Sequence, residues 1–349
     1  MNSAPLPQYF GRHPLCLAPM VGITDYAFRR SVQRYLPEGE NTIWPTEMLS
    51  SRRVLYQKED ERPENCLRDH EYGVHPQLLG NEKVFIQDSI KKLESWGAKG
   101  IDINMGCPVK KALKHNYGVA LMGDPGYAKK VVEWAVESST LPVSVKLRSG
   151  FDFSEQKLQK FIGGLRDAGA SWITLHPRKA GQKRRGVANW DQLKTLSQSI
   201  DVPLIGNGDV QCMDDFESRF KYYPVEKIMV GRALCARPWL FWQIGEKLGM
   251  KSPRDFAGQN APQSPIEEGA AYGKFLSFYL KELQELYGDF SKVKRRMVFL
   301  LHHGIQWLDF GLSLKKAVLK SKSIGEIENG LTTFFSQEQR MSKRTSLAQ

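Results

Sequence analysis

Eight short runs of β-forming residues alternate with longer amphipathic segments between residues 14 and 249, and this alternation limits the possible folds more than any other feature. Such alternation is typical of repeated β-α units around a parallel sheet. We expect two of the intervening helices at residues 82–96 and 125–138, the second capped by Asp124. We expect the strands at residues 15–18, 42–47, 74–79, 100–105, 143–147, 172–175, 204–205 and 228–230.

Eight β-α units in one stretch predict a (β/α)₈ TIM barrel over residues 14–249. The rival fold, a doubly wound open sheet, usually has fewer strands. It would also need a Gly-rich phosphate loop after its first strand, where this chain has Pro19-Met20-Val21-Gly22. We therefore predict the barrel.

The composition changes on either side of this region. Residues 1–13 form a short N-terminal extension, and the polar, Pro- and Gly-containing stretch 250–266 is typical of a linker. Residues 267–337 show helical apolar stripes, which predict a small all-helical C-terminal domain, and the polar tail 338–349 is expected to fray.

Charge and composition favour certain classes of protein. The formal net charge of +12 favours a polyanionic partner such as nucleic acid, and the basic residues cluster at 110–115 and 178–185. A solvated charged loop is the plain alternative for each cluster. Neither a membrane-spanning stretch nor a secretory signal is recognisable, so we expect a cytoplasmic protein. The five cysteines have no paired spacing that would indicate a disulfide framework or a metal site.

Chemically useful side chains follow most of the expected strands, and in a (β/α)₈ barrel these strand ends form the active site. Cys107 lies in a Gly-Cys-Pro turn after the fourth strand, ahead of Lys110 and Lys111. On its own such a cysteine is more often a small buried apolar residue than a reactive one. The other strand-end residues are Pro19, Met20, Gln77, Asn104, Lys146, Arg148, His176, Arg178, the turn Asn207-Gly208-Asp209 and the turn Gly231-Arg232.

Each of these polar residues could simply satisfy a neighbour in the core, but so many together would be costly to bury without a ligand. The two glycine-containing turns follow the last two strands, where such barrels commonly bind phosphate. The pattern predicts a phosphate-bearing cofactor with a polar ring. Lys146 would suit the electron-rich edge of a flavin, whose reduced form is anionic.

The ordered set of motifs resembles the bacterial-type tRNA-dihydrouridine synthase family, over residues 14 to about 249 and more weakly beyond. The motifs are at residues 18–25, 76–80, 102–111, 143–150, 176–178, 206–210 and 230–232. The resemblance implies an FMN-dependent reduction of the uracil C5–C6 bond in tRNA, with NADPH as the electron source and no metal.

The resemblance also implies residue roles. Cys107 is the implied proton donor to C5, while reduced FMN passes a hydride to C6 of a flipped uridine. Asn104 is expected to bind the uracil edge. The implied FMN contacts are Pro19, Met20, Val21, Gln77, Lys146 and His176, with Asn207, Gly208, Asp209, Gly231 and Arg232 at the ribityl phosphate. The expected RNA contacts are Lys110, Lys111, Arg178, Arg295, Arg296 and His303.

The helical region departs from the family pattern. The family often has an Arg-Lys-His run ahead of an aromatic residue, whereas here Leu301-His302-His303 precedes Trp307 and only the last histidine is kept. We expect Lys294, Arg295 and Arg296 to supply the RNA contact instead. Three alternatives stay open: ribosomal RNA as the substrate, an FMN-barrel reductase of a small molecule, and a catalytically silent RNA-binding protein. The sequence does not specify the modified uridine or the oligomeric state.

Overall fold

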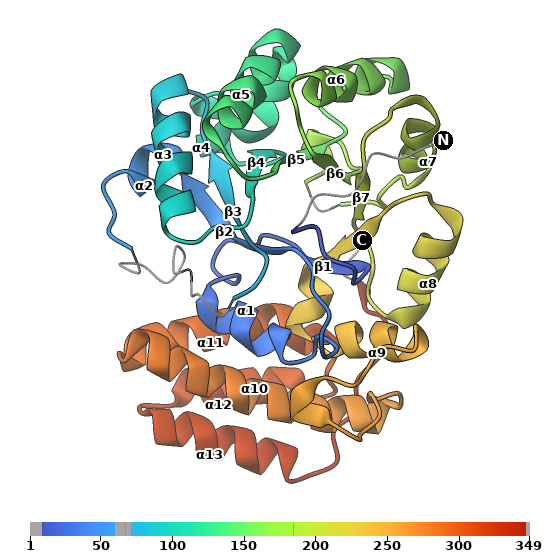
Figure 1. Ribbon diagram of the computed structural model, residues 1–349. Helices are drawn as coiled ribbons and strands as arrows, with labels where there is room; N and C mark the ends of the chain where they lie inside the picture. The colour runs from blue at the N-terminus through green and yellow to red at the C-terminus, as the bar shows by residue number, and fades with distance from the viewer. Residues whose placement is uncertain (1–8, 60–66, 68–70, 184, 347–349) are drawn as a thin grey trace.

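A computed structural model describes residues 9–59, 67, 71–183 and 185–346. Eight parallel strands form one curved sheet, with helices around its outer surface (Figure 1). The strands are β1 (Leu15–Leu17), β2 (Trp44–Ser50), β3 (Val74–Leu79), β4 (Ile101–Met105), β5 (Val143–Arg148), β6 (Trp172–His176), β7 (Leu204–Asn207) and β8 (Lys227–Val230).

The strand order β1-β8-β7-β6-β5-β4-β3-β2 brings the two ends of the sheet together in a nearly closed barrel. At this junction the Thr42 hydroxyl donates a hydrogen bond of 2.7 Å to the carbonyl of Leu15, which ties the start of the second β-α unit to β1. The predicted (β/α)₈ fold is confirmed. The main differences are at strand ends: β7 extends to Asn207 because its pairing with Met229 continues past the apolar residues, and β2 extends to Ser50.

Two kinds of core fill the space inside and outside the barrel. On β4, Ile101, Ile103 and Met105 are buried in the core cluster that also includes the helices. The alternate residues of that strand, Asp102 and Asn104, project to the opposite side, because successive side chains of a strand point to opposite faces. A separate apolar cluster, made of Phe10, Cys16, Ala18, Ile43, Trp172, Ile205 and Met229, fills another part of the interior. The barrel therefore combines an apolar interior cluster with a polar level at β4.

The outer helices follow the expected pattern. The helix predicted at residues 125–138 is α5 (Pro125–Ser138), and the Asp124 carboxylate accepts a capping hydrogen bond from the Tyr127 amide at 3.0 Å. The helix predicted at 82–96 is α3 (Lys83–Ser95). The others in this region are α1 (Tyr26–Gln33), α2 (Ser51–Val54), α4 (Lys110–Lys114), α6 (Glu155–Asp167), α7 (Asp191–Ser199), α8 (Met213–Tyr222) and α9 (Leu240–Lys247).

Four further helices pack beside the barrel as a separate layer (Figure 1): α10 (Pro265–Tyr287), α11 (Phe290–Gly304), α12 (Gly311–Lys320) and α13 (Ile324–Phe335). The helix α10 begins with a reciprocal cap between Ser264 and Glu267. It packs against α1, where Phe28 meets Phe275 edge-on at 6.3 Å between ring centroids. The stretch expected as a linker also packs on the barrel, because Phe256 stacks on Trp242 at 4.8 Å.

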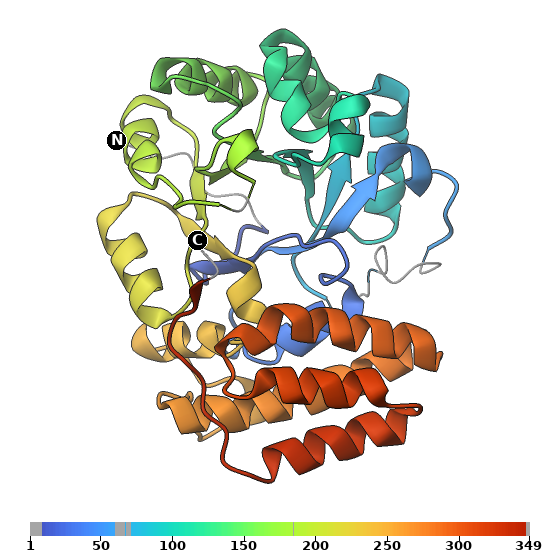
Figure 2. The ribbon, with the colours of Figure 1, turned by 180° about the vertical axis from the view of Figure 1, so that it is seen from behind.

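The segment after α13 packs against the rest of the protein over its described length. It runs back along the helical layer to the barrel (Figure 2). Met341 is buried, and the Arg237 guanidinium donates a 2.6 Å hydrogen bond to the carbonyl of Ser342. Arg344 pairs with Asp215 of α8 at 2.8 Å. The polar composition of this segment was misleading, because many of its polar groups have partners on the barrel.

Candidate active site

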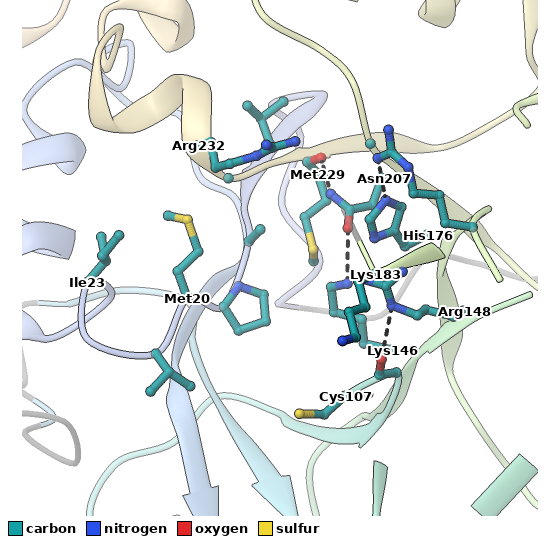
Figure 3. A pocket seen from close by; sticks show the side chains of 18 of the residues that line it. Met20, Ile23, Cys107, Lys146, Arg148, His176, Lys183, Asn207, Met229 and Arg232 are labelled. Atoms are coloured by element: carbon teal, nitrogen blue, oxygen red, sulfur yellow. Dashed lines mark hydrogen bonds between the residues drawn. The ribbon is translucent and has the colours of Figure 1, made fainter. Parts of the chain in front are cut away.

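A cavity of about 1120 Å³ opens at the carboxyl ends of the strands. Its wall combines residues from the loop after β1, from the ends of β3 to β8, and from α11. Figure 3 shows Cys107, Lys146, His176 and Asn207 around this space, with Met20 on another side. Of the predicted site residues, those that line the cavity are Pro19, Met20, Val21, Gln77, Asn104, Cys107, Lys110, Lys146, His176, Arg178, Asn207, Gly208, Asp209, Gly231, Arg232 and His303.

A chain of side-chain amides connects the polar interior to the cysteine turn. The Gln77 amide Nε2 donates to the Asp102 carboxylate at 2.6 Å, and Asn104 Nδ2 donates to Gln77 Oε1 at 2.8 Å. The side-chain oxygen Oδ1 of Asn104 accepts hydrogen bonds from the backbone amides of Gly106 at 3.1 Å and Cys107 at 2.9 Å. Asn104 therefore fixes the backbone that carries the thiol.

The turn at Cys107 also requires a glycine. Gly118 has φ +59°, and a Cβ atom there would lie 2.6 Å from the carbonyl oxygen of Cys107. The amide of Val119 donates to that same carbonyl at 3.2 Å. The cysteine turn is thus held both by Asn104 and by the segment at Gly118.

Lys146 is a desolvated cation at the centre of the site. Its Nζ donates to Asn207 Oδ1 at 3.0 Å, and Asn207 Nδ2 donates to the carbonyl of Met229 at 2.8 Å (Figure 3). Burial, with the neighbouring charge of Arg148, lowers the pKa of Lys146 to about 8. The amine therefore carries its proton at neutral pH and loses it under mildly alkaline conditions.

Arg178, which we expected to contact RNA, is buried and forms an ion pair within the protein. Its guanidinium is 1% exposed and holds both oxygens of Asp209 at 2.8 Å. Its Nη1 donates to His176 Nε2 at 3.1 Å. Because its charge is used internally, Arg178 is better placed to hold the cavity wall than to bind an RNA phosphate. Burial and the nearby cations lower the pKa of His176 well below its ordinary value, so this imidazole is neutral.

Other residues lie close to the glycines of the two turns that are predicted to bind phosphate. Gly208 has φ +129°, and a Cβ atom there would lie 3.0 Å from the His176 ring. Asp209 has φ +58° and its carboxylate already accepts from the Ala188 amide at 2.7 Å. A phosphate at this turn would therefore meet backbone N–H groups rather than the Asp209 carboxylate. A Cβ atom on Gly231 would lie 3.1 Å from the sulfur of Met20.

Basic residues surround the cavity mouth. Lys110 is exposed and lines the mouth, as do Lys183 and Arg185 of the second basic cluster. The side chain of Lys111 and residue Arg184 lie outside the part that the structure describes. The prediction of RNA contacts at this rim stays untested.

A buried cluster of charges joins the helical layer to the barrel, and it corrects the expected role of Arg296. The Arg296 side chain is 13% exposed, and its Nη1 donates to Glu47 Oε1 at 2.8 Å. Its Nε lies 3.7 Å from a carboxylate oxygen of Asp25. The other oxygen of Glu47 accepts from the Gly22 amide at 2.6 Å. This guanidinium is committed to the domain contact, whereas the neighbouring Arg295 is exposed and its RNA contact stays a prediction.

Sequence reasoning missed part of this arrangement. Glu47 stood at the end of an expected strand and could have been found by the same strand-end rule that identified Gln77. Phe299 and Trp307 also line the cavity, from the helical layer. Trp307 is the aromatic residue of the helical family pattern but had no expected role in the site, and Phe299 belongs to no motif. Their contribution to the cavity depends on how the helical layer packs on the barrel.

Other kinds of site find no support in residues 9–59, 67, 71–183 and 185–346. They contain no group of three or more His, Cys, Asp or Glu side chains arranged to hold a metal ion. Within the same ranges, no helix is both long and apolar enough to cross a bilayer. The fold and cavity define a (β/α)₈-barrel protein with its candidate site at the carboxyl ends of the strands.

Comparisons with known proteins identify the family. The model of the dihydrouridine synthase (Dus) family matches residues 16–270. A probable tRNA-dihydrouridine synthase of Rickettsia conorii is 35% identical over 235 residues, which are 67% of this chain and 70% of that protein. The tRNA-dihydrouridine synthase B of Vibrio vulnificus is 29% identical over 280 residues, covering 80% of this chain and 82% of the other.

The chain belongs to the dihydrouridine synthase family, and it is therefore an oxidoreductase. The expected family resemblance is confirmed. Among solved structures, a 2-naphthoyl-CoA reductase complex matches with a TM-score of 0.54 at 9% identity, covering 70% of this chain and 52% of that one. At this identity the likeness concerns the barrel fold alone.

Proposed function

We propose that this protein reduces the C5–C6 bond of specific uridines in tRNA to 5,6-dihydrouridine, with FMN as cofactor and NADPH as the reductant of the flavin. The observation that carries the proposal is the position of the Cys107 thiol. It faces the same cavity as the polar groups of Gln77 and Lys146, at the carboxyl ends of neighbouring strands. Membership of the dihydrouridine synthase family supports the reaction, and the names of the relatives support tRNA as substrate.

The residues present fit a flavin mononucleotide. The cavity of about 1120 Å³ exceeds the space usual for one small ligand, which leaves room for a cofactor and a flipped base. Gln77 offers an amide and Lys146 a cation, both suited to a polar ring. Gly208 and Gly231 carry no side chain that would keep a phosphate away from the backbone of these turns. When bound, the reduced flavin would supply a hydride for C6 of the uracil.

Each group of lining residues has a proposed role in holding this cofactor. Pro19, Met20 and Val21 would pack against the ring, while the Lys146 ammonium would stabilise negative charge at its polar edge. Neutral His176 would line the same site. The backbone of the turns Asn207-Gly208-Asp209 and Gly231-Arg232 would hold the ribityl phosphate.

Cys107 is the proposed general acid. Its thiol would donate a proton to C5 of the uracil on the side opposite the hydride, and solvent would then restore the proton. Asn104 uses its side-chain carbonyl to hold the cysteine turn and one amide N–H to bind Gln77, so its second N–H is the group available to a uracil oxygen. Lys110, Lys111, Arg295 and His303 would contact the RNA around the mouth.

Three measurements test this function. Purified protein should take up FMN and show a flavin absorbance spectrum, and a folded protein that binds no added FMN would contradict the cofactor assignment. Dihydrouridine mapping in tRNA and rRNA, from cells with and without the gene, should show losses confined to tRNA; losses in rRNA would change the substrate. Cys107→Ala should bind FMN and oxidise NADPH but form little dihydrouridine, whereas normal turnover would remove Cys107 from its role.

A further inference from the structure

A buried carboxylate inside the barrel has no role in the function proposed so far. Asp102 is 5% exposed and projects from β4 at the level of Gln77 on β3 and Ser144 on β5, its register partners in the parallel ladder. Interiors of such barrels are usually filled by apolar residues, and burying a carboxylate is costly. A residue kept at this cost needs an explanation.

The hydrogen bonds of Asp102 form one end of a directed chain. An ionised carboxylate can only accept hydrogen bonds, so the NH₂ group of Gln77 must face it. The carbonyl of Gln77 then faces Asn104 and accepts from its NH₂ group. The carbonyl of Asn104 is left facing the backbone N–H groups of Gly106 and Cys107. The acceptor at Asp102 and the backbone donors at Gly106 and Cys107 thus impose the same direction on both amides, and of these two ends only Asp102 is a side chain that a substitution can change.

We propose that Asp102 is a positioning residue that sets the direction of the Gln77–Asn104 amide chain and thereby holds the Cys107 turn and orients both amides toward the cavity. A primary amide has two N–H donors, and the chain uses one from each side chain. The second N–H of Gln77 and of Asn104 is thus available to carbonyl oxygens of ligands in the cavity that both residues line. The consequence for catalysis rests on the proposed role of Cys107, but the orientation of the chain does not.

Reversal of the chain has a definite structural effect. Suppose that an amide replaces the Asp102 carboxylate and turns its NH₂ group toward Gln77. The carbonyl of Gln77 would then turn to face this new NH₂ group, and the NH₂ group of Gln77 would face Asn104. The NH₂ group of Asn104 would then face the Cys107 amide, and two donors would meet. The hydrogen bond that holds the Cys107 amide would be lost.

The test uses Asp102→Asn, which keeps the shape of the side chain but removes the requirement for an acceptor. Amide hydrogen exchange on the peptides covering residues 103–118 should become about fivefold faster at Gly106 and Cys107, as expected for loss of one hydrogen bond. Ser144→Ala is the matched control. It removes the other hydrogen bond to Asp102, donated at 2.7 Å, and should leave this exchange as in the wild type.

A double variant separates orientation from simple damage. When Asp102→Asn is combined with Gln77→Glu, the carboxylate moves one position along the chain. It can then accept from both the introduced amide and the Asn104 amide, so the Asn104 carbonyl again faces Cys107. Exchange at Cys107 should return to the wild-type rate. Unchanged exchange in Asp102→Asn, or equally fast exchange in the double variant, would overturn the proposal. Because no readout involves dihydrouridine, failure here is distinct from failure of the proposed function.

Discussion

The ion-pair cluster around Arg296 predicts that one residue of the helical domain controls both stability and the shape of the cavity wall. Arg296 neutralises Glu47 and lies near Asp25, and the side chains of these two acids are 7% and 0% exposed. Glu47 in turn accepts from the Gly22 amide, next to the loop that carries Met20 and Val21. The perturbation is Arg296→Met, which keeps much of the side-chain volume and removes the charge.

The expected loss of stability follows from the carboxylates left behind. Breaking a buried pair by removing one partner typically costs 3–5 kcal/mol, and we expect about 3 kcal/mol here because Arg296 keeps slight solvent contact. For a chain of this size that loss lowers the unfolding temperature by roughly 4 °C. The adjacent Arg295 is exposed, so Arg295→Met should change the free energy of unfolding by less than about 0.5 kcal/mol.

The loss should depend on pH. Burial raises the pKa values of Asp25 and Glu47, and the charge of Arg296 opposes that rise. Without Arg296 both pKa values rise further, so the folded state holds protons that the unfolded state releases. Such groups favour folding below their unfolded pKa and lose that contribution as pH rises through the folded pKa. The deficit of Arg296→Met should therefore be smaller at pH 5 than at pH 8.

The assay is urea or thermal unfolding of Arg296→Met, Arg295→Met, Glu47→Gln and the double variant Glu47→Gln with Arg296→Met. Glu47→Gln keeps a carbonyl oxygen for the Gly22 amide. The Arg296 substitution should cost less in the Glu47→Gln background, with a coupling of about 2 kcal/mol. Equal stability of Arg296→Met and Arg295→Met, or a deficit independent of pH, would refute the reasoning.

Three further predictions concern the site. Burial lowers the pKa of Lys146 to about 8, and negative charge on a bound flavin would raise it again, so FMN binding should weaken as pH rises through about 8. This pH dependence should be absent in Lys146→Met, and an unchanged dependence would assign it to another group. Gly118→Ala should lower the free energy of unfolding by about 1–3 kcal/mol, because Gly118 has a positive φ and an added Cβ atom would meet Cys107. The control Gly163→Ala should raise the free energy of unfolding by about 0.5–1 kcal/mol, because Gly163 lies within α6 with open space beside it. Equal denaturation midpoints for the two variants would contradict this reasoning. Lys110→Ala should weaken tRNA binding and reduce the slope of log affinity against log salt by about 1, and an unaltered slope would exclude a phosphate contact there.

The sequence predicted the part of the site that depends on strand ends. Once the strands were located, the position of Gln77, Lys146 and His176 at a shared face followed from the geometry of a parallel barrel, and these residues do line one cavity. Cys107 was found in the same way. Its hydrogen bond to Asn104 lies within a four-residue turn, where local sequence is informative.

Charge pairing was the part that the sequence did not decide. Arg178, Arg295 and Arg296 are all basic residues in regions expected to meet RNA, and nothing in their spacing distinguishes them. In the folded chain Arg178 binds Asp209, 31 positions away, and Arg296 binds Glu47, 249 positions away, while Arg295 is exposed.

The sequence by itself determined the barrel, the helical C-terminal domain and the residues at the strand ends, because hydrophobic periodicity and turn residues act over short distances along the chain. Only the tertiary structure decided which charges are neutralised internally, that α11 completes the cavity wall, and that the C-terminal segment returns to the barrel. These outcomes depend on desolvation and on contacts between residues far apart in sequence, which a local pattern does not contain.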